Sequence, residues 1–347
     1  MNYKKLLLLV FIISCLSLNA QRKTAPHHLE KKSNTEWFEN ADFGMFIHFG
    51  LYSELGGFWK NDTIQGYAEW IQAKADIPSK KYSKLIKSFN PENFDADAIA
   101  KLAKKAGMKY LVVTAKHHEG FCLWSSDYTK FDISTTPYKK DIIEQLTEAC
   151  KSNGLKFGVY YSIIDWHHPT QKTNNSAKDY WDKWAQIEMK KGQFEDYLAY
   201  MKNQLSELIT EYDPDIIWFD GDWVDWWSLE EGIALYDYIK NLNPEILVNN
   251  RVAKRELFKK DFGTPEQEHL KSGEDYLWEA CYTLNDSWGY KKGDDNWKSA
   301  STIYSKLQEI KVNGGNLLLN IGPKANGSIP EKSRFILLEV GEMLENE

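Results

Sequence analysis

The chain has 347 residues, 42% of them hydrophobic, which is long enough for one large domain with a substantial core. Its net charge of -7 argues against a nucleic-acid-binding protein, because phosphates require a basic surface. Its 14 tryptophans, 19 tyrosines and 16 phenylalanines form a composition that sugar-binding enzymes often share.

The N-terminal residues have the pattern of an export signal. Lys4 and Lys5 precede an apolar run over residues 6–18, and the small residue Ala20 follows shortly afterwards. A positive start, a short apolar stretch and a small residue at the cleavage position are typical of a secretory signal peptide, and the run is too short for a comfortable membrane span. We therefore predict a signal peptide over residues 1–20 and a periplasmic or secreted protein.

A second interpretation of this segment stays open. Residues 12–15 (Ile-Ile-Ser-Cys) also match the box that precedes the lipid-modified cysteine of bacterial lipoproteins. In that case Cys15 would carry a lipid anchor, and membrane contact is expected only then. The polar and basic residues 21–34 are predicted to be a flexible lead-in to a single catalytic domain over residues 35–347.

Short apolar runs alternate with longer amphipathic segments through the rest of the chain. Strands are predicted at residues 43–49, 110–115, 156–162, 215–220, 245–249, 276–280 and 316–321. Helices are predicted at residues 96–105, 142–152, 197–212, 229–241 and 299–312. This alternation indicates an α/β fold with parallel strands, either a closed (β/α) barrel or an open doubly wound sheet. No Gly-x-Gly-x-x-Gly follows an early strand, which weakens the nucleotide-binding form of the open sheet.

The barrel is favoured by the polar residues that close the predicted strands. They are His48, the run 116–119 (Lys-His-His-Glu), Tyr161, Asp220 and the run 249–251 (Asn-Asn-Arg). In a (β/α) barrel the C-terminal ends of the strands meet on one face and build the active site. We therefore predict an irregular TIM-like barrel, with residues 165–192 as an insertion over the mouth of the site.

The segment over residues 216–223 (Ile-Ile-Trp-Phe-Asp-Gly-Asp-Trp) carries the sharpest chemical signal. An apolar strand ends in Asp220, and Gly221 lets the backbone turn away at once. Neighbouring aromatic residues exclude water and offer flat faces to a ring-shaped ligand. A carboxylate held in this way suits attack on the anomeric carbon of a sugar, and the tryptophans at positions 223–227 would form a wall of the pocket or contact the leaving group.

A second carboxylate is needed as an acid and base. Glu266 lies on a loop after the fifth predicted strand, where it could reach a leaving oxygen. Glu279 lies inside a short apolar run, and burial would raise its pKa as a general acid requires. We assign the acid and base role to Glu266, with a supporting structural role for Glu279, which remains the alternative.

No metal or other cofactor is predicted. His117 and His118 are adjacent, so in an extended backbone they point to opposite sides and cannot easily chelate one ion. We expect neutral imidazoles that donate hydrogen bonds to sugar hydroxyls. Arg251 would orient a carboxylate or bind a hydroxyl, or form an ordinary ion pair. The cysteines at positions 122, 150 and 281 have no regular spacing and are expected to be buried thiols.

Taken together, these residues resemble the α-L-fucosidases of glycoside hydrolase family 29. The resemblance extends from about residue 37 to the end of the chain and includes Phe-Gly-Met-Phe-Ile-His-Phe-Gly at 43–50, Ala-Lys-His-His-Glu-Gly-Phe at 115–121 and Leu-Leu-Asn-Ile-Gly-Pro at 318–323. Further matching blocks lie at residues 37–38, 69–70, 217–221, 248–251 and 287–290. So many blocks in the same order make the resemblance specific.

The resemblance implies a retaining mechanism without a cofactor, acting on a fucosylated oligosaccharide or glycoconjugate. It implies that Asp220 is the nucleophile and that Glu266, in a Thr-Pro-Glu stretch, is the acid and base. The positions that match fucose contacts are His48, Glu69, Trp70, His117, His118, Tyr161, Trp218 and Arg251. Trp288 and Phe46 are expected to supply an apolar patch for the methyl group of fucose. Family members usually carry a C-terminal β-sandwich, and this chain is expected to lack it.

Two alternatives of different kinds stay open. A non-catalytic sugar-binding barrel would keep the aromatic residues but would not need both carboxylates. A retaining glycosidase could act on another sugar related to fucose. An esterase is disfavoured because no Gly-x-Ser-x-Gly occurs in the chain, and a metal-dependent hydrolase because no chelating pattern does.

Overall fold

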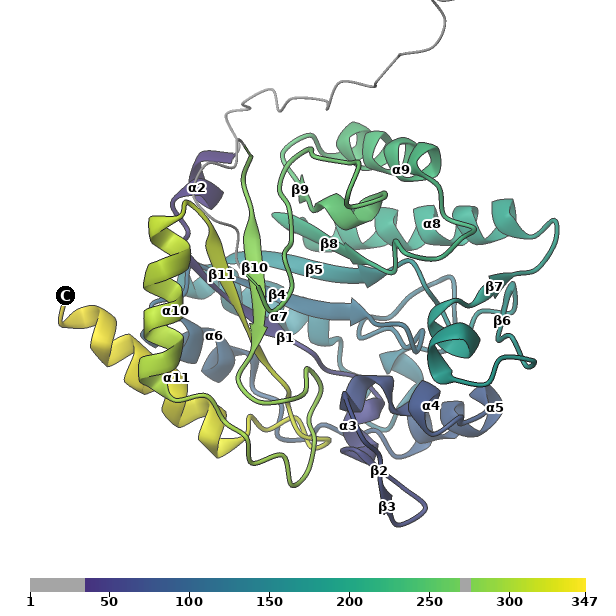
Figure 1. Cartoon of the computed structure of the whole chain (residues 1–347), viewed down its shortest axis with the longest axis horizontal. Helices are drawn as coiled ribbons and strands as arrows, with labels where there is room; N and C mark the ends of the chain where they lie inside the picture. Colours follow the sequence, from purple (N-terminus) through teal and green to yellow (C-terminus); the bar gives the residue numbers. More distant parts are fainter. Residues whose placement is uncertain (1–34, 269–275) are drawn as a thin grey trace, which may run out of the picture.

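The computed structural model describes residues 35–268 and 276–347, and a curled sheet of seven parallel strands is at its centre (Figure 1). The strand order is β10, β11, β1, β4, β5, β8 and β9. The bounds are β1 (Phe43–Ile47), β4 (Tyr110–Lys116), β5 (Lys156–Ser162), β8 (Ile216–Asp220), β9 (Leu247–Val248), β10 (Glu279–Thr283) and β11 (Asn316–Ile321). Every pairing within this sheet is parallel, so the C-terminal ends of all these strands lie at one end.

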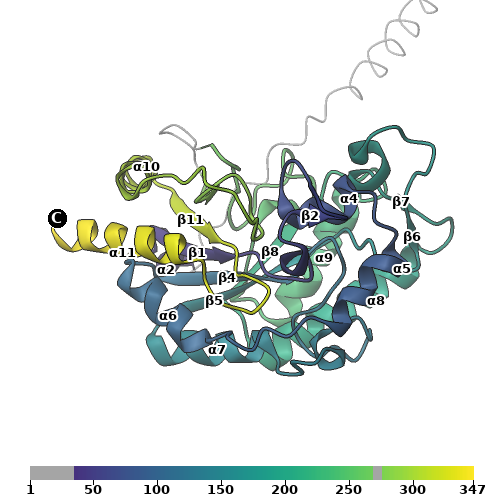
Figure 2. The same cartoon turned by 90° about the horizontal axis from the view of Figure 1, so that it is seen from below.

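Helices cover the outside of the curled sheet (Figure 2). The longer ones are α6 (Ala96–Lys105), α7 (Ile142–Asn153), α8 (Phe194–Tyr212), α9 (Leu229–Leu242), α10 (Ala300–Val312) and α11 (Glu331–Glu345). Their starts follow from local chemistry. The side chains of Asp95 and Asp141 accept bonds from the first turns of α6 and α7, and Ser228 forms a reciprocal capping box with Glu231 at the start of α9.

Short elements lie mainly in the loops around the C-terminal ends of the strands. The short helices are α2 (Glu36–Glu39), α3 (Tyr52–Leu55), η2 (Ala68–Trp70), α4 (Ile71–Lys74), α5 (Ser79–Tyr82), η3 (Ser83–Lys87), η4 (Ile133–Thr135), η5 (Trp181–Ala185) and η6 (Asn250–Val252). Two small antiparallel ribbons pair β2 (Phe58–Trp59) with β3 (Asp62–Thr63) and β6 (Gln171–Lys172) with β7 (Glu188–Met189).

The gap between the two edge strands, β9 and β10, is closed by residues 262–266. Asn249, just after β9, bridges in parallel to Phe262, while Gly263 and Glu266 bridge to Trp278 and Cys281 on the β10 side. Backbone bonds accompany these bridges, such as Gly263 N to Leu277 O at 2.8 Å and Glu279 N to Gly263 O at 2.9 Å. The segment therefore occupies the place of an eighth strand, and the fold is an irregular TIM-like barrel.

The alternation of side chains along the strands gives two separate cores. One lies inside the barrel and includes Phe46, Tyr110, Tyr160, Trp218 and Phe262. The larger one fills the space between the strands and the surrounding helices. A residue two positions after an inner-core residue on the same strand again points inward, so it reaches the C-terminal mouth of the barrel.

Most of the predicted elements are confirmed. β5, β11 and α6 have the predicted bounds, and the other predicted helices differ by a few residues at their ends. The strand predicted at 276–280 is shifted, because β10 begins only at Glu279. The closing segment 262–266 and helix α11 were not predicted. Residues 165–192 do lie between β5 and α8, as expected for an insertion, and the described residues contain no β-sandwich.

The predicted signal peptide, Cys15 and the lead-in at 21–34 lie outside the described residues. In the ranges 35–268 and 276–347, no helix combines the length and apolar character that a membrane crossing requires. All three described cysteines, Cys122, Cys150 and Cys281, are buried and free, as predicted.

The closing segment is anchored by Asp261, and this anchor can be tested. Its carboxylate accepts bonds from the backbone nitrogen of Val248 at 2.9 Å and from the hydroxyl of Tyr236 at 2.8 Å, and it pairs with Lys240 at 2.6 Å. In Asp261→Ala the buried Val248 N–H and Tyr236 hydroxyl would lose their acceptor. We expect the free energy of unfolding in urea to fall by about 2 to 4 kcal/mol.

Tyr236→Phe is the matched control, because it removes one of these bonds and leaves the carboxylate in place. It should cost about 1 kcal/mol. An Asp261→Ala protein as stable as the wild type would contradict the anchoring role.

Candidate active site

The mouth of the barrel holds a cavity of about 240 Å³. Its wall combines strand-end residues with residues of the loops above them. The lining residues are Phe46, His48, Tyr67, Glu69, Trp70, His117, Tyr160, Tyr180, Trp181, Trp218, Asp220, Trp223, Arg251, Arg255, Glu266, Cys281 and Trp288. Acids, imidazoles, guanidinium groups and aromatic faces therefore meet at the end of the barrel where active sites of this fold occur.

Asp220 lies at the tip of β8 with partners on both carboxylate oxygens. Oδ1 accepts a bond from Arg251 Nη1 at 2.8 Å, and Arg255 lies 3.5 Å away. Oδ2 accepts the hydroxyl of Tyr160 at 3.2 Å. Burial alone would raise the pKa of Asp220, but the charges of Arg251 and Arg255 bring it below its ordinary value. Asp220 is therefore a fixed, ionised carboxylate facing the cavity.

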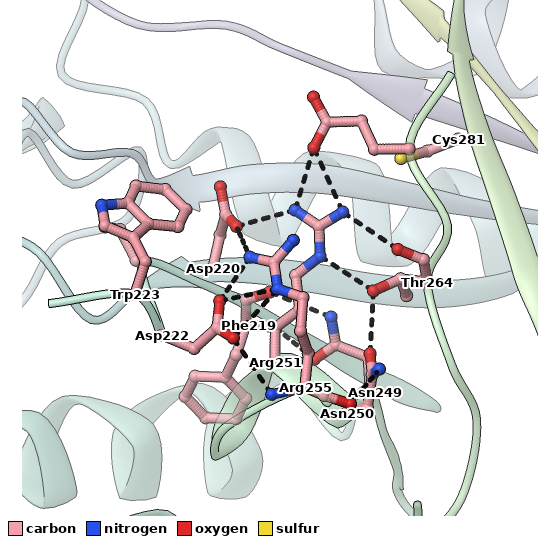
Figure 3. Close-up of polar contacts among 12 residues, drawn as sticks. Phe219, Asp220, Asp222, Trp223, Asn249, Asn250, Arg251, Arg255, Thr264 and Cys281 are labelled. Carbon is pink, nitrogen blue, oxygen red and sulfur yellow. Dashed lines mark hydrogen bonds and ion pairs between the residues drawn. The ribbon is translucent and has the colours of Figure 1, made fainter. Parts of the chain in front are cut away.

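Arg251 is the centre of a hydrogen-bond network that Figure 3 displays together with Asp220, Arg255 and Thr264. Its guanidinium donates to the hydroxyl of Thr264 at 2.8 Å and to the backbone oxygen of Thr264 at 3.0 Å. The same group lies 4.7 Å from the centre of the Trp218 ring. Because η6 and the closing segment both hold Arg251, its position is set by backbone as well as by side chains.

Glu266 lies at the end of the closing segment and shares Arg251 with Asp220. Its Oε2 accepts bonds from Nη1 and Nη2 of Arg251, both at 3.1 Å. Nη1 thus binds both carboxylates. The distance between the two bound oxygens therefore cannot exceed the sum of the two hydrogen-bond lengths, 2.8 and 3.1 Å. This upper limit is below the separation of about 6.5 to 9.5 Å that is typical of inverting glycosidases, and it is compatible with the shorter separation of retaining ones. The Glu266 side chain is 39% exposed, so it can reach a group entering from solvent.

The histidines are neutral, and their free nitrogens accept hydrogen bonds. Burial lowers the pKa of His48 to about 3 and that of His118 to about 4. His48 Nδ1 donates to Asn320 Oδ1 at 2.7 Å, and His118 Nδ1 donates at 2.6 Å to Ser162, whose own proton goes to the Ile164 carbonyl. Each Nε2 is then a bare lone pair. With this tautomer the ring protons of His48 and His118 are used inside the protein, whereas His117 still fits the expectation of an imidazole that donates to a sugar hydroxyl.

His117 and His118 do not face opposite sides, as an ideal extended strand would require. Their ring centres are 4.3 Å apart, because β4 ends at Lys116 and a turn follows. His117 lines the cavity, while His118 is buried behind it with Nε2 3.6 Å from Asp220 Oδ2. His117 Nδ1 is buried and has no hydrogen-bond partner among the described residues.

Glu69, Trp70 and Trp288 also lie in the cavity wall. The Oε2 atom of Glu69 accepts the backbone nitrogen of Gly289 at 2.8 Å, whereas its Oε1 has no partner. Burial raises the pKa of Glu69 to about 7. The Trp288 ring lies 5.2 Å from His48 and, with Phe46, forms the apolar side of the cavity.

Tyr161 is not in the cavity, contrary to the prediction. Its hydroxyl donates to Gln204 of α8 at 2.8 Å, on the helix-facing side of β5. Tyr160 points into the barrel instead, because it pairs in register with the inward-facing Trp218. A shift of one residue exchanges the two faces of a strand, and the sequence alone does not reveal which tyrosine faces the core.

Glu279 lies beneath the cavity and does not line it. Its carboxylate accepts the indole of Trp218 at 2.9 Å and the hydroxyl of Tyr110. Burial raises its pKa to about 7. Trp218 lines the cavity and separates it from Glu279, whereas Glu266 lines the cavity itself. The structure therefore favours a supporting role for Glu279 and favours Glu266 as the candidate for the acid and base.

Several residues of the wall were not identified from the sequence. They are Tyr67, Tyr160, Tyr180, Trp181, Arg255 and Cys281. Tyr180 and Trp181 come from the insertion, and Arg255 is held by Asp222, which binds its Nε atom at 2.9 Å. Arg255 could have been expected from the sequence in one respect. Asp222 follows Asp220 by two residues, and two carboxylates so close together suggest a second cation beside Arg251.

The comparisons with known proteins agree with this geometry. The family model described as "Alpha-L-fucosidase" matches residues 11–347. An α-L-fucosidase of Dictyostelium discoideum is 28% identical over 373 residues, covering 98% of this chain and 76% of that protein. The chain thus belongs to the α-L-fucosidases of glycoside hydrolase family 29.

Solved structures extend this similarity to the fold. The unliganded α-L-fucosidase AlfC from Lactobacillus casei is 35% identical with a TM-score of 0.79, over 90% of this chain and 98% of that one. A family 29 α-L-fucosidase from Bacteroides thetaiotaomicron, solved as a trapped covalent intermediate, is 29% identical with a TM-score of 0.82. This second similarity covers 92% of the present chain and 76% of that protein.

The raised pKa of Glu279 predicts a pH-dependent stability. Its pKa is about 7 in the folded protein against an ordinary 4.5, so its stabilising contribution is complete below pH 4.5 and is lost as the pH rises through 7. Glu279→Gln keeps the shape and cannot ionise. Between pH 5 and pH 8 we expect the variant to gain up to about 3 kcal/mol relative to the wild type, measured by urea unfolding.

Glu148→Gln, at an exposed position of α7, is the control and should give parallel stability curves. If Glu279→Gln also ran parallel to the wild type from pH 5 to pH 8, the buried carboxyl would not titrate in this range.

Proposed function

We propose that this chain is a retaining α-L-fucosidase that releases terminal α-L-fucosyl residues from glycans by double displacement. The observation that carries the proposal is the single Arg251 nitrogen that binds both Asp220 and Glu266 at the mouth of the barrel. Its two bonds keep the nearest oxygens of the carboxylates closer together than the separation of about 6.5 to 9.5 Å that is typical of inverting enzymes, which supports a covalent mechanism. Family membership narrows the substrate class to fucosides.

In the first step Asp220 attacks the anomeric carbon while Glu266 protonates the departing glycosidic oxygen. Arg251 and Arg255 keep Asp220 ionised, so it enters the reaction as a nucleophile without needing a base. On Glu266, Oε2 accepts both Arg251 bonds, which leaves Oε1 to exchange the proton with the leaving group. A covalent fucosyl ester on Asp220 results.

In the second step Glu266, now a carboxylate, removes a proton from water, and the water oxygen attacks the anomeric carbon. The ester bond to Asp220 breaks and the product keeps the original anomeric configuration. Arg251 stays hydrogen-bonded to Asp220 in both steps. It therefore stabilises the negative charge that returns to the Asp220 carboxylate when the ester bond breaks.

The ring hydroxyls would be bound by the acceptors of the cavity. His48 Nε2 and Oε1 of Glu69 accept hydroxyl protons; among the described residues, this buried Glu69 oxygen has no other partner. Phe46 and Trp288 supply the apolar surface that suits the methyl group of fucose. A sugar with a hydroxymethyl group there would have to bury an extra hydroxyl, which costs free energy.

The assignment of the two carboxylates can be tested with azide and an aryl α-L-fucoside. Asp220→Gly should lower kcat by about ten-thousandfold or more, because no nucleophile remains. Azide fits the space of the missing carboxylate and attacks from the same face, so the rescued product should be β-L-fucosyl azide, identified by NMR. In Glu266→Ala the fucosyl-enzyme still forms, and azide should give the α-anomer instead.

The anomer of the azide product thus distinguishes the nucleophile from the acid and base. The Glu279→Gln variant serves as the matched control and should retain turnover without azide rescue. Substantial activity in Asp220→Gly, or the β-azide from Glu266→Ala, would refute the assigned roles. A wild-type protein inactive on α-L-fucosides but active on another sugar would favour the related glycosidase.

We also propose that the chain is exported. The support is the sequence pattern of residues 1–20, with the lipid-anchored form at Cys15 as the alternative.

The mature N-terminus distinguishes these two forms. Mass spectrometry of the full-length protein, expressed in a bacterium with both processing routes, should find a chain that begins at Gln21. A chain that begins at an acylated Cys15 would support the anchor, and Cys15→Ser should then release it from the membrane. An unprocessed chain in the cytoplasm would contradict export.

A further inference from the structure

Above the deep part of the cavity lies a group of aromatic residues, here called the aromatic rim: Trp70, Tyr180, Trp181 and Trp223. The rings of Trp181 and Trp223 are stacked with centres 5.9 Å apart, and those of Trp70 and Trp181 with centres 6.4 Å apart. Tyr180 and Trp181 are 37% and 44% exposed, which is high for residues that line a cavity. The rim offers broad apolar faces to solvent at the entrance.

The insertion that carries Tyr180 and Trp181 is held in place by tryptophan side chains. The indoles of Trp166, Trp223 and Trp226 donate to the carbonyls of residues 184, 185 and 187, respectively, at 3.0, 3.0 and 2.7 Å. Three indole N–H groups on one short stretch of backbone fix its position over the cavity.

A second set of contacts fixes the same insertion to the far side of the entrance. Asp76, which follows α4, accepts Lys183 Nζ at 2.8 Å and the indole of Trp184 at 3.1 Å. Figures 1 and 2 both place β6 and β7 beside α4 and α5. The insertion therefore connects two walls of the site, and its exposed aromatic residues are preorganised.

The rim lines the same cavity as Asp220 and Glu266, and its two exposed residues, Tyr180 and Trp181, lie toward solvent. Trp223 follows the nucleophile Asp220 by three residues, and Trp70 lies 5.0 Å from His118. On the other side, Tyr67 lies near Glu266, and the neighbouring charge of Glu266 adds to the effect of burial in raising the pKa of Tyr67. Aromatic residues and Glu266 thus share the wall of one cavity.

The charges of the wall argue against an acidic ligand at this place. Arg255 binds Asp222 through both its backbone and its side chain, and Arg251 binds Asp220 and Glu266. Both arginines of the cavity wall are thus balanced by carboxylates. A neutral ligand with an apolar face fits better than a charged one.

We propose that the aromatic rim is a leaving-group subsite that binds the neutral pyranose to which fucose is linked, with Trp181 as its main stacking surface. The proposal rests on the fucosidase function proposed above. The C–H face of a pyranose packs on an indole face, and the rim presents this face beside the acid and base. Binding energy from this second ring would lower the barrier for glycan substrates specifically.

The test compares two substrates that share the fucosyl ring. α-L-Fucosyl fluoride has a leaving group too small to reach Trp181, whereas a fucosyl disaccharide, the best of a linkage-defined panel, places a pyranose there. In Trp181→Ala, kcat/KM for the disaccharide should fall by roughly tenfold to a hundredfold, while kcat/KM for the fluoride stays within about twofold. Trp181→Phe should retain most of the disaccharide activity.

Tyr128→Ala is the matched control, because Tyr128 is 48% exposed but lies outside the cavity wall. It should leave both substrates unaffected. Equal losses on both substrates in Trp181→Ala, or no loss on the disaccharide, would overturn the leaving-group subsite. A wild-type protein unable to hydrolyse the fluoride would instead overturn the underlying fucosidase function.

Discussion

The site depends on one buried guanidinium. Arg251 binds the carboxylate at the tip of β8 and the carboxylate at the end of the closing segment, and its remaining donors go to Thr264. A buried cation is stable only when its charge and its N–H groups are matched, so each partner constrains the others. The two acids would repel each other without the arginine, and the arginine could not stay buried without the acids. The contacts that place the two carboxylates are thus the same contacts that allow Arg251 to be buried in the folded protein.

The barrel supports this arrangement through register. Because all strands are parallel, their C-terminal ends meet, and residues two apart on one strand share a face. Trp218 and Asp220 therefore point inward together, and Tyr160 joins them from the neighbouring strand. Glu279 adds support from below through its bonds to Trp218 and Tyr110. The floor of the cavity is the top of the inner core.

Local sequence patterns predicted much of the fold and of the candidate site. The features that depend on pairing between distant strands could not be predicted in this way. Amphipathic runs located most helices, and apolar runs with polar ends located the strands and the residues Asp220, His48 and Arg251. Tyr161 was taken for Tyr160 because register depends on the partner strand. Residues 262–266 were missed because the segment contains Gly and Pro and pairs only at isolated bridges. The insertion was placed over the mouth of the site, but which of its aromatic residues face the cavity was not predicted, because loops show no periodicity that assigns their direction.

The weakly paired closing segment has a consequence for how such enzymes diverge. It ends at Glu266, and its pairing with the β9 and β10 sides consists of isolated bridges, whereas the strand that carries Asp220 is paired along its whole length with β5. Substitutions in this segment leave the backbone pairing of β8 with β5 intact, but they reach Asp220 through Arg251, which binds Thr264, Glu266 and Asp220. Natural or engineered variation at this edge of the barrel therefore acts on both carboxylates at once.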